Sequence, residues 1–339
     1  MNFKRISFSS GSTDFYFAGG WSRLKELASP DSTVLITDEH VYAAHTRRFR
    51  GWNTIVLKPG EEYKLQATAD AIVEQLIGME ADRKTTLVGV GGGVVTDITG
   101  YVASVYMRGI RFGFVPTTML GLVDASVGGK NGVDVGEYKN LVGIIRQPSF
   151  ILHEMAFLRS LPEAQWQNGF AEIIKHAAIR DAAMFRELEG STLKSYRSKP
   201  AATCRLVQRN VMLKAKVVQA DEFEKNERRL LNFGHTIGHA LETQYELLHG
   251  QAIAIGMTCA AHFSRQLAGF REPERLVHLL ERYGLPTYAA FDKTKVYTIL
   301  RMDKKRERSA MNFILLKRLG AAVVQPVSMD QLKQLLEEY

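Results

Sequence analysis

The 339-residue chain has few of the features that mark secreted, membrane-bound or disordered proteins. Its two cysteines, Cys204 and Cys259, form no Cys-x-x-Cys site and suggest no disulfide framework, so we expect packed thiols. No apolar h-region follows the amino terminus and no apolar run approaches a membrane span, which predicts a cytoplasmic protein without a membrane partner. Repeats and low-complexity segments are also lacking, and a hydrophobic fraction of 45% is enough for a full core.

Three known sequence motifs, those of zinc peptidases, nucleotide hydrolases and dinucleotide-binding proteins, are present only in part. Each missing residue makes the corresponding activity less well supported. Thr236 stands where a zinc peptidase carries glutamate after its first histidine, which argues against peptidase chemistry. Asp124 and Asn131 replace the first glycine and the final Ser or Thr of a nucleotide-hydrolase loop. Val94 replaces the last glycine of the dinucleotide-binding pattern. The turn at 89–94 therefore either receives a pyrophosphate or only joins a strand tightly to a helix.

Charge gives weak support for nucleic-acid binding. The net charge is +8, from 44 basic and 36 acidic residues. The one concentrated basic segment, 301–308, is interrupted by Asp303 and Glu307 and has no interleaved aromatic residues. The pattern predicts no nucleic-acid partner and favours a small anionic ligand.

The two halves of the chain differ in their hydrophobic periodicity. Short β-branched runs alternate with helical segments in the first half, at Thr33–Thr37, Thr54–Leu57, Thr85–Val90 and Arg111–Pro116. This rhythm predicts a Rossmann-like parallel sheet of βαβ units over residues 1–155. Residues 156–339 are predicted to form a mostly α-helical domain, with late strands at 312–316 and 321–324. We expect a ligand cleft between the two domains.

Three histidines lie within fifteen residues in the second half. His235 and His239 are four apart in a helical segment and so share one face, and His249 sits beside Gly250, where a second helix would begin. Neutral imidazole is a common ligand of zinc-like ions, which need three protein ligands in a catalytic site. The spacing alone leaves a second interpretation open, in which these histidines are satisfied by hydrogen bonds on a helix face.

A carboxylate for such a site is available about sixty residues upstream. Glu172, Lys175 and His176 share one face of a predicted helix whose opposite stripe is apolar. On spacing alone, an exposed Glu-Lys pair on a solvated face is the simpler interpretation.

Further motifs provide glycine and positive charge. Gly91-Gly92-Gly93 ends an apolar strand and opens a helix, where backbone N–H groups can approach a pyrophosphate. Lys130, Lys139 and Arg108 add three cations for an anionic ligand.

These residues together resemble one family across the whole chain, the 3-dehydroquinate synthases of the sugar phosphate cyclase superfamily. The resemblance rests on motifs in a fixed order: Gly60-Glu61-Glu62-Tyr63-Lys64, Gly91–Asp97, Tyr106–Gly109, Val115–Thr118, Val123–Lys130, Lys139-Asn140, Gly169–Lys175, Leu230–His239 and His249-Gly250. It implies an NAD- and metal-dependent lyase in the shikimate pathway, acting on 3-deoxy-D-arabino-heptulosonate 7-phosphate. It also implies a homodimer.

The resemblance assigns roles residue by residue. It makes Glu172, His235 and His249 the ligands of zinc or cobalt and His239 a neighbouring active-site group, which replaces the helix-pair interpretation. The implied NAD positions are Asp38, Glu61, Lys64, Gly92, Gly93, Asp97, Thr117, Thr118, Lys130, Lys139, Phe157 and Ser160. The implied substrate positions are Arg108, Asp124, Lys130, Lys139, Lys175, Lys214, Arg228, Asn232 and His239, with Lys304 or Lys305 or both.

Four positions depart from the family pattern: His40, Thr96, Asn131 and Gln251. Related cyclases acting on sedoheptulose 7-phosphate or glucose 6-phosphate differ near such loops, so they remain alternatives. A metal-dependent polyol dehydrogenase is another, although it needs fewer cations facing its substrate.

Overall fold

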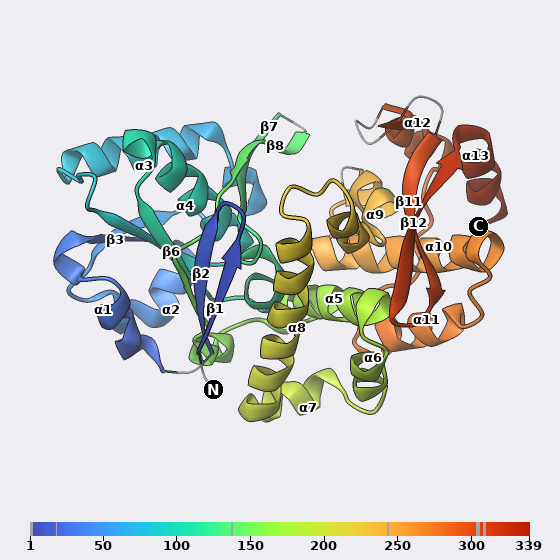
Figure 1. The fold of residues 1–339 in the computed structure, drawn as a ribbon, viewed down its shortest axis with the longest axis horizontal. Helices are drawn as coiled ribbons and strands as arrows, with labels where there is room; N and C mark the ends of the chain where they lie inside the picture. The colour runs from blue at the N-terminus through green and yellow to red at the C-terminus, as the bar shows by residue number, and fades with distance from the viewer. Residues whose placement is uncertain (1–2, 18, 137, 243, 303–305, 308–309) are drawn as a thin grey trace. The chain divides into compact units, whose positions relative to one another are not determined.

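The computed structural model describes all residues except 1–2, 18, 137, 243, 303–305 and 308–309. The chain folds into two compact units, each assembled from two separate stretches of sequence. The first unit comprises Met1–Gln165 and Pro200–Phe223, and the second comprises Trp166–Lys199 and Glu224–Tyr339. Helix α8 (Pro200–Ala220) thus belongs to the first unit (Figure 1). The predicted assignment of functions to 1–155 and 156–339 stays a prediction.

The first unit is built on a seven-stranded sheet of order β1-β2-β9-β6-β5-β3-β4. All neighbouring strands from β2 at one side to β4 at the other pair in parallel. Strand β1, at the edge, pairs antiparallel with β2. The strands are β1 (Phe3–Phe8), β2 (Gly11–Tyr16), β3 (Thr33–Asp38), β4 (Asn53–Leu57), β5 (Thr86–Gly91), β6 (Arg111–Pro116) and β9 (Phe150–Leu152). The four predicted strands and the Rossmann-like fold class are confirmed.

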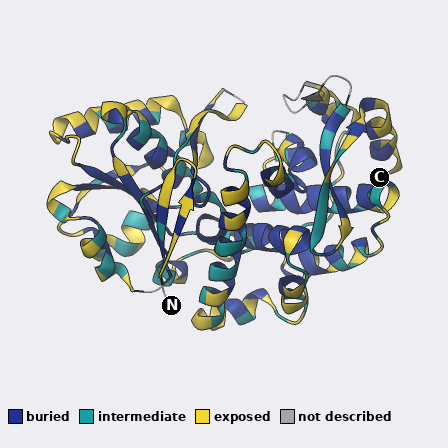
Figure 2. Ribbon diagram, viewed as in Figure 1, coloured by how far each residue is buried: buried dark blue, intermediate teal, exposed yellow. Residues whose placement is uncertain are grey.

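The central strands are buried because their sequences are apolar on both faces. Every residue of β5 is buried, and β3 and β6 are buried but for one end residue each (Figure 2). Such continuous runs are typical of parallel strands covered on both sides. The helices of this unit are α1 (Leu24–Leu27), α2 (Glu39–Phe49), α3 (Gln66–Gly78), α4 (Gly93–Val105) and α8. The strand order reverses between β3 and β5, and ligands bind such sheets at the carboxyl ends of the strands beside that point.

A separate two-stranded ribbon lies between β6 and β9 in the chain. Strands β7 (Lys130–Val135) and β8 (Tyr138–Ile145) pair antiparallel. The sequence analysis did not identify this ribbon, since β8 is exposed along seven of its eight residues and lacks alternation of polar and apolar side chains.

The second unit is mostly helical, as predicted. Its helices are α5 (Glu163–Arg180), α6 (Ala182–Glu189), α7 (Leu193–Ser198), α9 (His235–Glu242), α10 (His249–Ala268), α11 (Pro273–Arg282), α12 (Lys293–Met302) and α13 (Met329–Glu338). A small sheet of β10 (Arg306–Glu307), β11 (Ala310–Arg318) and β12 (Ala321–Ser328) confirms the late strands. Ile255, Phe263 and Leu332 are in its apolar core.

Two compositional expectations can be compared with the fold. Cys259 is a buried free thiol, and Cys204 is half-buried with its Sγ 3.3 Å from the Phe17 carbonyl oxygen. Within the described residues, no helix has the length and apolar character needed to cross a membrane. Lys304 and Lys305 lie outside the described residues.

Candidate active site

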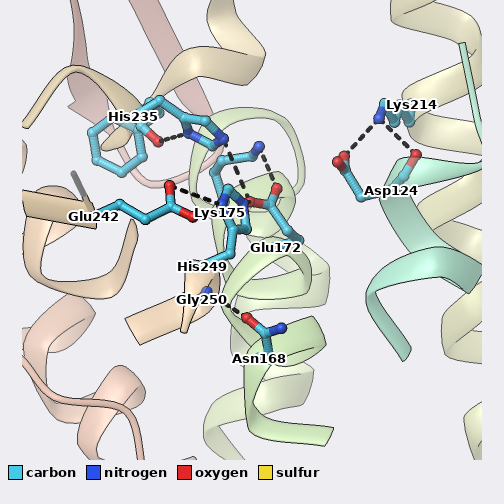
Figure 3. A network of polar contacts seen from close by, with 10 residues as sticks. Asp124, Asn168, Glu172, Lys175, Lys214, His235, Glu242, His249 and Gly250 are labelled. Carbon is cyan, nitrogen blue, oxygen red and sulfur yellow. Dashed lines mark hydrogen bonds and ion pairs between the residues drawn. The ribbon is translucent and has the colours of Figure 1, made fainter. Parts of the chain in front are cut away.

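A carboxylate and two imidazoles converge inside the second unit. Glu172 comes from α5, His235 from the first turn of α9, and His249 from the first turn of α10. Glu172 Oε1 lies 3.6 Å from His235 Nε2 and 3.2 Å from His249 Nε2 (Figure 3). The three donor atoms lie within 4.8 Å of one another, so one ion can contact all of them.

The carboxylate of Glu172 is buried from solvent. Glu172 and His176 are fully buried, and Lys175 is 2% exposed and forms an ion pair with Glu172. The solvated Glu-Lys face considered from the spacing is therefore wrong, because α5 is enclosed on both its polar and its apolar side (Figure 2). A buried charge needs a partner of opposite charge or a metal. Lys175 is the partner of opposite charge for Glu172.

The two histidines differ in their electrostatics. Burial lowers the pKa of His235 well below its ordinary value, and the nearby Lys175 lowers it further, which favours the neutral imidazole. Burial also opposes protonation of His249, but hydrogen bonds to Glu172 and Glu242 raise its pKa to about 9. Perturbed groups of this kind are concentrated at functional sites.

Each of these histidines has an oxygen atom near its second ring nitrogen. His235 Nδ1 lies 3.1 Å from the Phe233 carbonyl oxygen, and His249 Nδ1 lies 3.7 Å from Glu242 Oε2. Glu242 was not among the residues predicted from the sequence. A signal was available, because Glu242 is seven residues after His235 and so occupies the same face of α9. His239 is exposed and forms a second group with Glu242 and His249.

The start of α10 is fixed by polar contacts of its backbone. Leu248 N–H donates to Gln251 Oε1 at 2.9 Å, and Gly250 N–H donates to the Asn168 side chain of α5. A Cβ at Gly250 would collide with the Asn168 backbone, so only glycine fits this close approach of α10 to α5. The predicted helix start at His249 is confirmed.

In the first unit, predicted residues gather where parallel strands end. Asp38 ends β3, Gly91 ends β5 and Thr117 follows β6. Asp38 Oδ1 caps α2 by accepting from Val41 N–H at 2.9 Å. Gly92 caps α4, where a Cβ would lie 3.0 Å from Thr118 Cγ2. The carboxyl ends of adjacent strands share one edge, so the topology brings these residues together.

The buried Lys64 contacts several polar side chains of the first unit. Lys64 Nζ lies 2.5 Å from Asp97 Oδ2 and donates to Asn140 Oδ1 at 2.6 Å, and Glu61 Oε1 is 3.9 Å away. Burial tends to lower the pKa of Lys64, but Asp97 and Glu61 raise it above its ordinary range. Lys139, next to Asn140 on β8, is exposed and acts electrostatically on Glu61.

Asp124 and Lys214 form a second polar contact in the first unit. Lys214 Nζ on α8 lies 2.7 Å from Asp124 Oδ1 and donates to the Asp124 carbonyl oxygen at 2.8 Å (Figure 3). Lys130 is exposed at the start of β7. Arg108 is not brought to the same edge as Asp38, because it precedes β6 instead of following it.

Two predicted cofactor residues lie beside α2. Phe157 is 1% exposed and packs edge-on against Trp21 and His45. Ser160 Oγ lies 2.8 Å from His45 Nε2. Phe157 is therefore part of the core, and its contact with a cofactor stays a prediction.

Arg228 and Asn232 lie on a 3₁₀ segment of the second unit, Glu227–Asn232. Arg228 is 2% exposed. Asn232 Nδ2 donates to Glu224 Oε1 at 2.5 Å, and Glu224 has a φ of 58°. Glu224 was not predicted from the sequence, because its left-handed backbone and its contact with Asn232 are visible only in the structure.

Comparisons with known proteins divide the chain once, near the first boundary between the two units, and count α8 with the C-terminal part. A family described as 3-dehydroquinate synthase N-terminal matches residues 54–168, and one described as 3-dehydroquinate synthase C-terminal matches residues 169–306. A 3-dehydroquinate synthase of Campylobacter curvus (strain 525.92) is 38% identical over 331 residues, which cover 94% of both proteins. The chain belongs to the 3-dehydroquinate synthase family.

Two solved structures are similar to this member of the 3-dehydroquinate synthase family at 26% identity. One is a 2-deoxy-scyllo-inosose synthase complexed with carbaglucose-6-phosphate, NAD⁺ and Co²⁺, with a TM-score of 0.86 and 99% of each chain covered. The other is ValA, the 2-epi-5-epi-valiolone synthase of Streptomyces hygroscopicus subsp. jinggangensis 5008, with NAD⁺ and Zn²⁺ bound. Its TM-score is 0.87, with 99% of this chain and 97% of the other covered.

Three of the departures from the 3-dehydroquinate synthase pattern have local partners. Thr96 Oγ1 donates to the Gly93 carbonyl oxygen at 2.9 Å within α4. Asn131 Nδ2 donates to the carbonyl oxygens of Gly129 and Arg146. Gln251 accepts from Leu248 N–H. Each substituted side chain thus has a structural task, and nothing in the structure explains His40, which is exposed.

Proposed function

We propose that this protein converts 3-deoxy-D-arabino-heptulosonate 7-phosphate to 3-dehydroquinate and phosphate, as a phosphate-eliminating lyase. The observation that carries the proposal is the 38% identity to a 3-dehydroquinate synthase over 94% of both chains. The relatives named for other cyclic products are 26% identical. This difference favours the seven-carbon acid phosphate over the substrates of related cyclases.

Glu172, His235 and His249 would hold one divalent ion, zinc or cobalt. Ligand atoms about 2.1 Å from a tetrahedral ion lie about 3.4 Å from one another. The carboxylate-to-imidazole distances of 3.2 and 3.6 Å match this spacing. Three protein ligands leave one position of a tetrahedral site for the substrate.

The carboxyl edge of the first unit would hold NAD. Gly92 and Gly93 present backbone at the amino terminus of α4, where a pyrophosphate is stabilised by N–H groups and the helix dipole. Thr117 Oγ1 is buried and has no hydrogen-bond partner among the described residues, so a cofactor polar group would satisfy it. The other proposed contacts are Asp38, Glu61, Lys64, Asp97, Thr118, Lys130, Lys139, Phe157 and Ser160.

The two bound groups explain why the substrate site is rich in cations. NAD would accept and return the C5 hydride, and the metal would acidify a hydroxyl of the substrate. We assign the phosphate to Lys130 and Arg108, and the carboxylate to Lys175 and Arg228, because anionic ends require charge-assisted donors. Asp124, Lys139, Lys214, Asn232 and His239 complete the proposed set.

Phosphate release from 3-deoxy-D-arabino-heptulosonate 7-phosphate tests the proposal directly. The metal-loaded protein with substoichiometric NAD should release phosphate and form 3-dehydroquinate without accumulating NADH. Release only from sedoheptulose 7-phosphate or glucose 6-phosphate would contradict the substrate assignment. Continuous NADH production from a polyol would instead identify a dehydrogenase.

We also infer a cytoplasmic homodimer, which rests on the family resemblance. Light scattering on the purified protein checks its assembly, and a monomeric mass over the working concentration range would contradict it.

A further inference from the structure

Glu242 is a buried carboxylate beside the candidate metal ligands, and the proposed chemistry gives it no role. Its side chain is 9% exposed at the carboxyl end of α9. Oε2 lies 3.7 Å from His249 Nδ1, on the side of the ring opposite the Nε2 atom that faces Glu172 (Figure 3). The imidazole of His249 is thus held between two carboxylates.

The chemistry of imidazole gives this arrangement a consequence. A metal-binding histidine uses one unprotonated nitrogen, so its single hydrogen must sit on the other. An acceptor at Nδ1 fixes that tautomer, orients the ring and strengthens Nε2 as a donor to the ion. His235 has the Phe233 carbonyl oxygen in this place, whereas His249 has a carboxylate.

Helix α9 carries both His235 and Glu242. His235 and Glu242 are seven residues apart, almost two full turns, and lie on one face of the helix. One rigid element therefore carries a candidate ligand and the group that faces another ligand. A shift of α9 would disturb both histidines together.

We propose that Glu242 is a positioning residue that fixes the tautomer and orientation of His249 for binding the divalent ion. The inference rests on the proposed metal site. A competing arrangement makes Glu242 itself a ligand, since His239, Glu242 and His249 also lie close enough to share an ion. We favour the positioning role because Glu242 faces Nδ1, while Glu172 and His235 meet His249 on its Nε2 side.

Zinc affinity of the full-length protein, without substrate or NAD, tests this role. The Zn²⁺ dissociation constant is measured by competition with a chromophoric chelator, and the Co²⁺ form is examined by visible absorption. Glu242→Ala should weaken zinc binding by roughly 10- to 100-fold. Glu242→Gln, which keeps an acceptor oxygen and the shape of the side chain, should recover part of the loss. The exposed Glu246→Gln is the matched control and should bind zinc like the wild type.

The possible outcomes separate this inference from the metal site itself. The Co²⁺ band should shift in Glu242→Ala but keep the intensity of a site with its ligands intact. Wild-type affinity in both Glu242 variants would overturn the inference, and so would a loss as complete as that of His249→Ala, which would make Glu242 a ligand. If wild-type protein binds no ion, or His249→Ala binds as well as wild type, the proposed metal site fails. Should Glu242→Ala not fold, the isosteric Glu242→Gln decides between these results.

Discussion

The first unit presents a turn of backbone to its candidate ligand, whereas the second presents side chains from three helices. Gly92 and Gly93 follow a strand and open a helix, so neighbouring residues form that surface. Glu172 and His249 are 77 residues apart and meet only through helix packing. Local sequence therefore encodes the first site, and tertiary structure assembles the second. Substitutions that affect one site and leave the other unchanged test this distinction.

The largest effect is expected at the side-chain site. His249→Ala removes one of the three proposed ligands and should lower activity by roughly a thousandfold or more while abolishing stoichiometric metal. Elemental analysis and phosphate release measure the two effects, and NAD affinity should stay unchanged. His278→Ala, an exposed histidine on α11, is the control. Full activity with a full complement of metal would remove His249 from the ligand set.

A smaller effect is expected at the backbone site. The Cβ of Gly92→Ala would lie 3.0 Å from Thr118 Cγ2 and would occupy the surface that faces the cofactor. NAD affinity should fall by roughly tenfold or more, measured by fluorescence titration, with metal content unchanged. Gly78→Ala is the control, because no atom lies within 4 Å of its added Cβ. Unchanged NAD affinity in Gly92→Ala would place the cofactor elsewhere.

Arg228→Lys tests geometry at constant charge in the second unit. A guanidinium donates two parallel hydrogen bonds to a carboxylate, and an ammonium does not, so KM should rise by about tenfold. The adjacent Arg229→Lys serves as the control in steady-state kinetics and should leave KM near the wild-type value. Equal KM values for the two variants would argue against a carboxylate at Arg228.

The smallest effect on activity is expected at Glu222, which joins three segments of the first unit. Its carboxylate accepts from Ser9, from Ser10 and from Gln147 Nε2 at 2.7 Å. Burial opposes the charge, but the hydrogen bonds from Ser10, Ser9 and Gln147 outweigh it and lower the pKa of Glu222 to about 2. The charged form is therefore the form that stabilises the fold.

The sign of the pH dependence follows from that lowered pKa. The stabilisation is complete above the unfolded-state pKa of about 4.3 and is lost as the pH falls toward 2. Glu222→Gln should lower the free energy of unfolding by about 2–3 kcal/mol at pH 7, with the difference vanishing near pH 2. Urea titrations at several pH values measure it. Glu26→Gln, at the surface, is the control, and an equal loss at pH 7 and pH 2 would refute the linkage.

The comparison also explains which features the sequence could predict. Strands β3, β5 and β6 were predictable because their side chains are apolar on both faces. The glycine-rich turn followed from the end of β5, whereas Asp38 and Thr117 were named only by the family resemblance. The exposed strand β8 was not predictable, since its side chains follow neither periodicity. Helical spacing placed Glu172 and Lys175 on one face but could not reveal that α5 is enclosed on every side.

The proposed positioning residue, Glu242, was harder to predict than the proposed ligands. Glu242 has the spacing of a residue that shares a face with His235, yet a carboxylate on a helix is usually solvated, and only packing shows it beside His249. Motif resemblance named the three proposed ligands because the order of the motifs along the chain is specific. The resemblance did not name Glu242, which lies beside His249.

Because the first unit is formed from two separate stretches of sequence, its parts are synthesised at different times. Residues 1–165 leave the ribosome well before α8, which carries Lys214 and precedes Glu222. At about 5–20 residues per second, the segment from 166 to 223 takes roughly 3–12 seconds to translate. For most of that interval the nascent sheet lacks Lys214, which pairs with Asp124, and Glu222, which accepts hydrogen bonds from Ser9 and Ser10. The first unit is therefore completed only after part of the second has already been made.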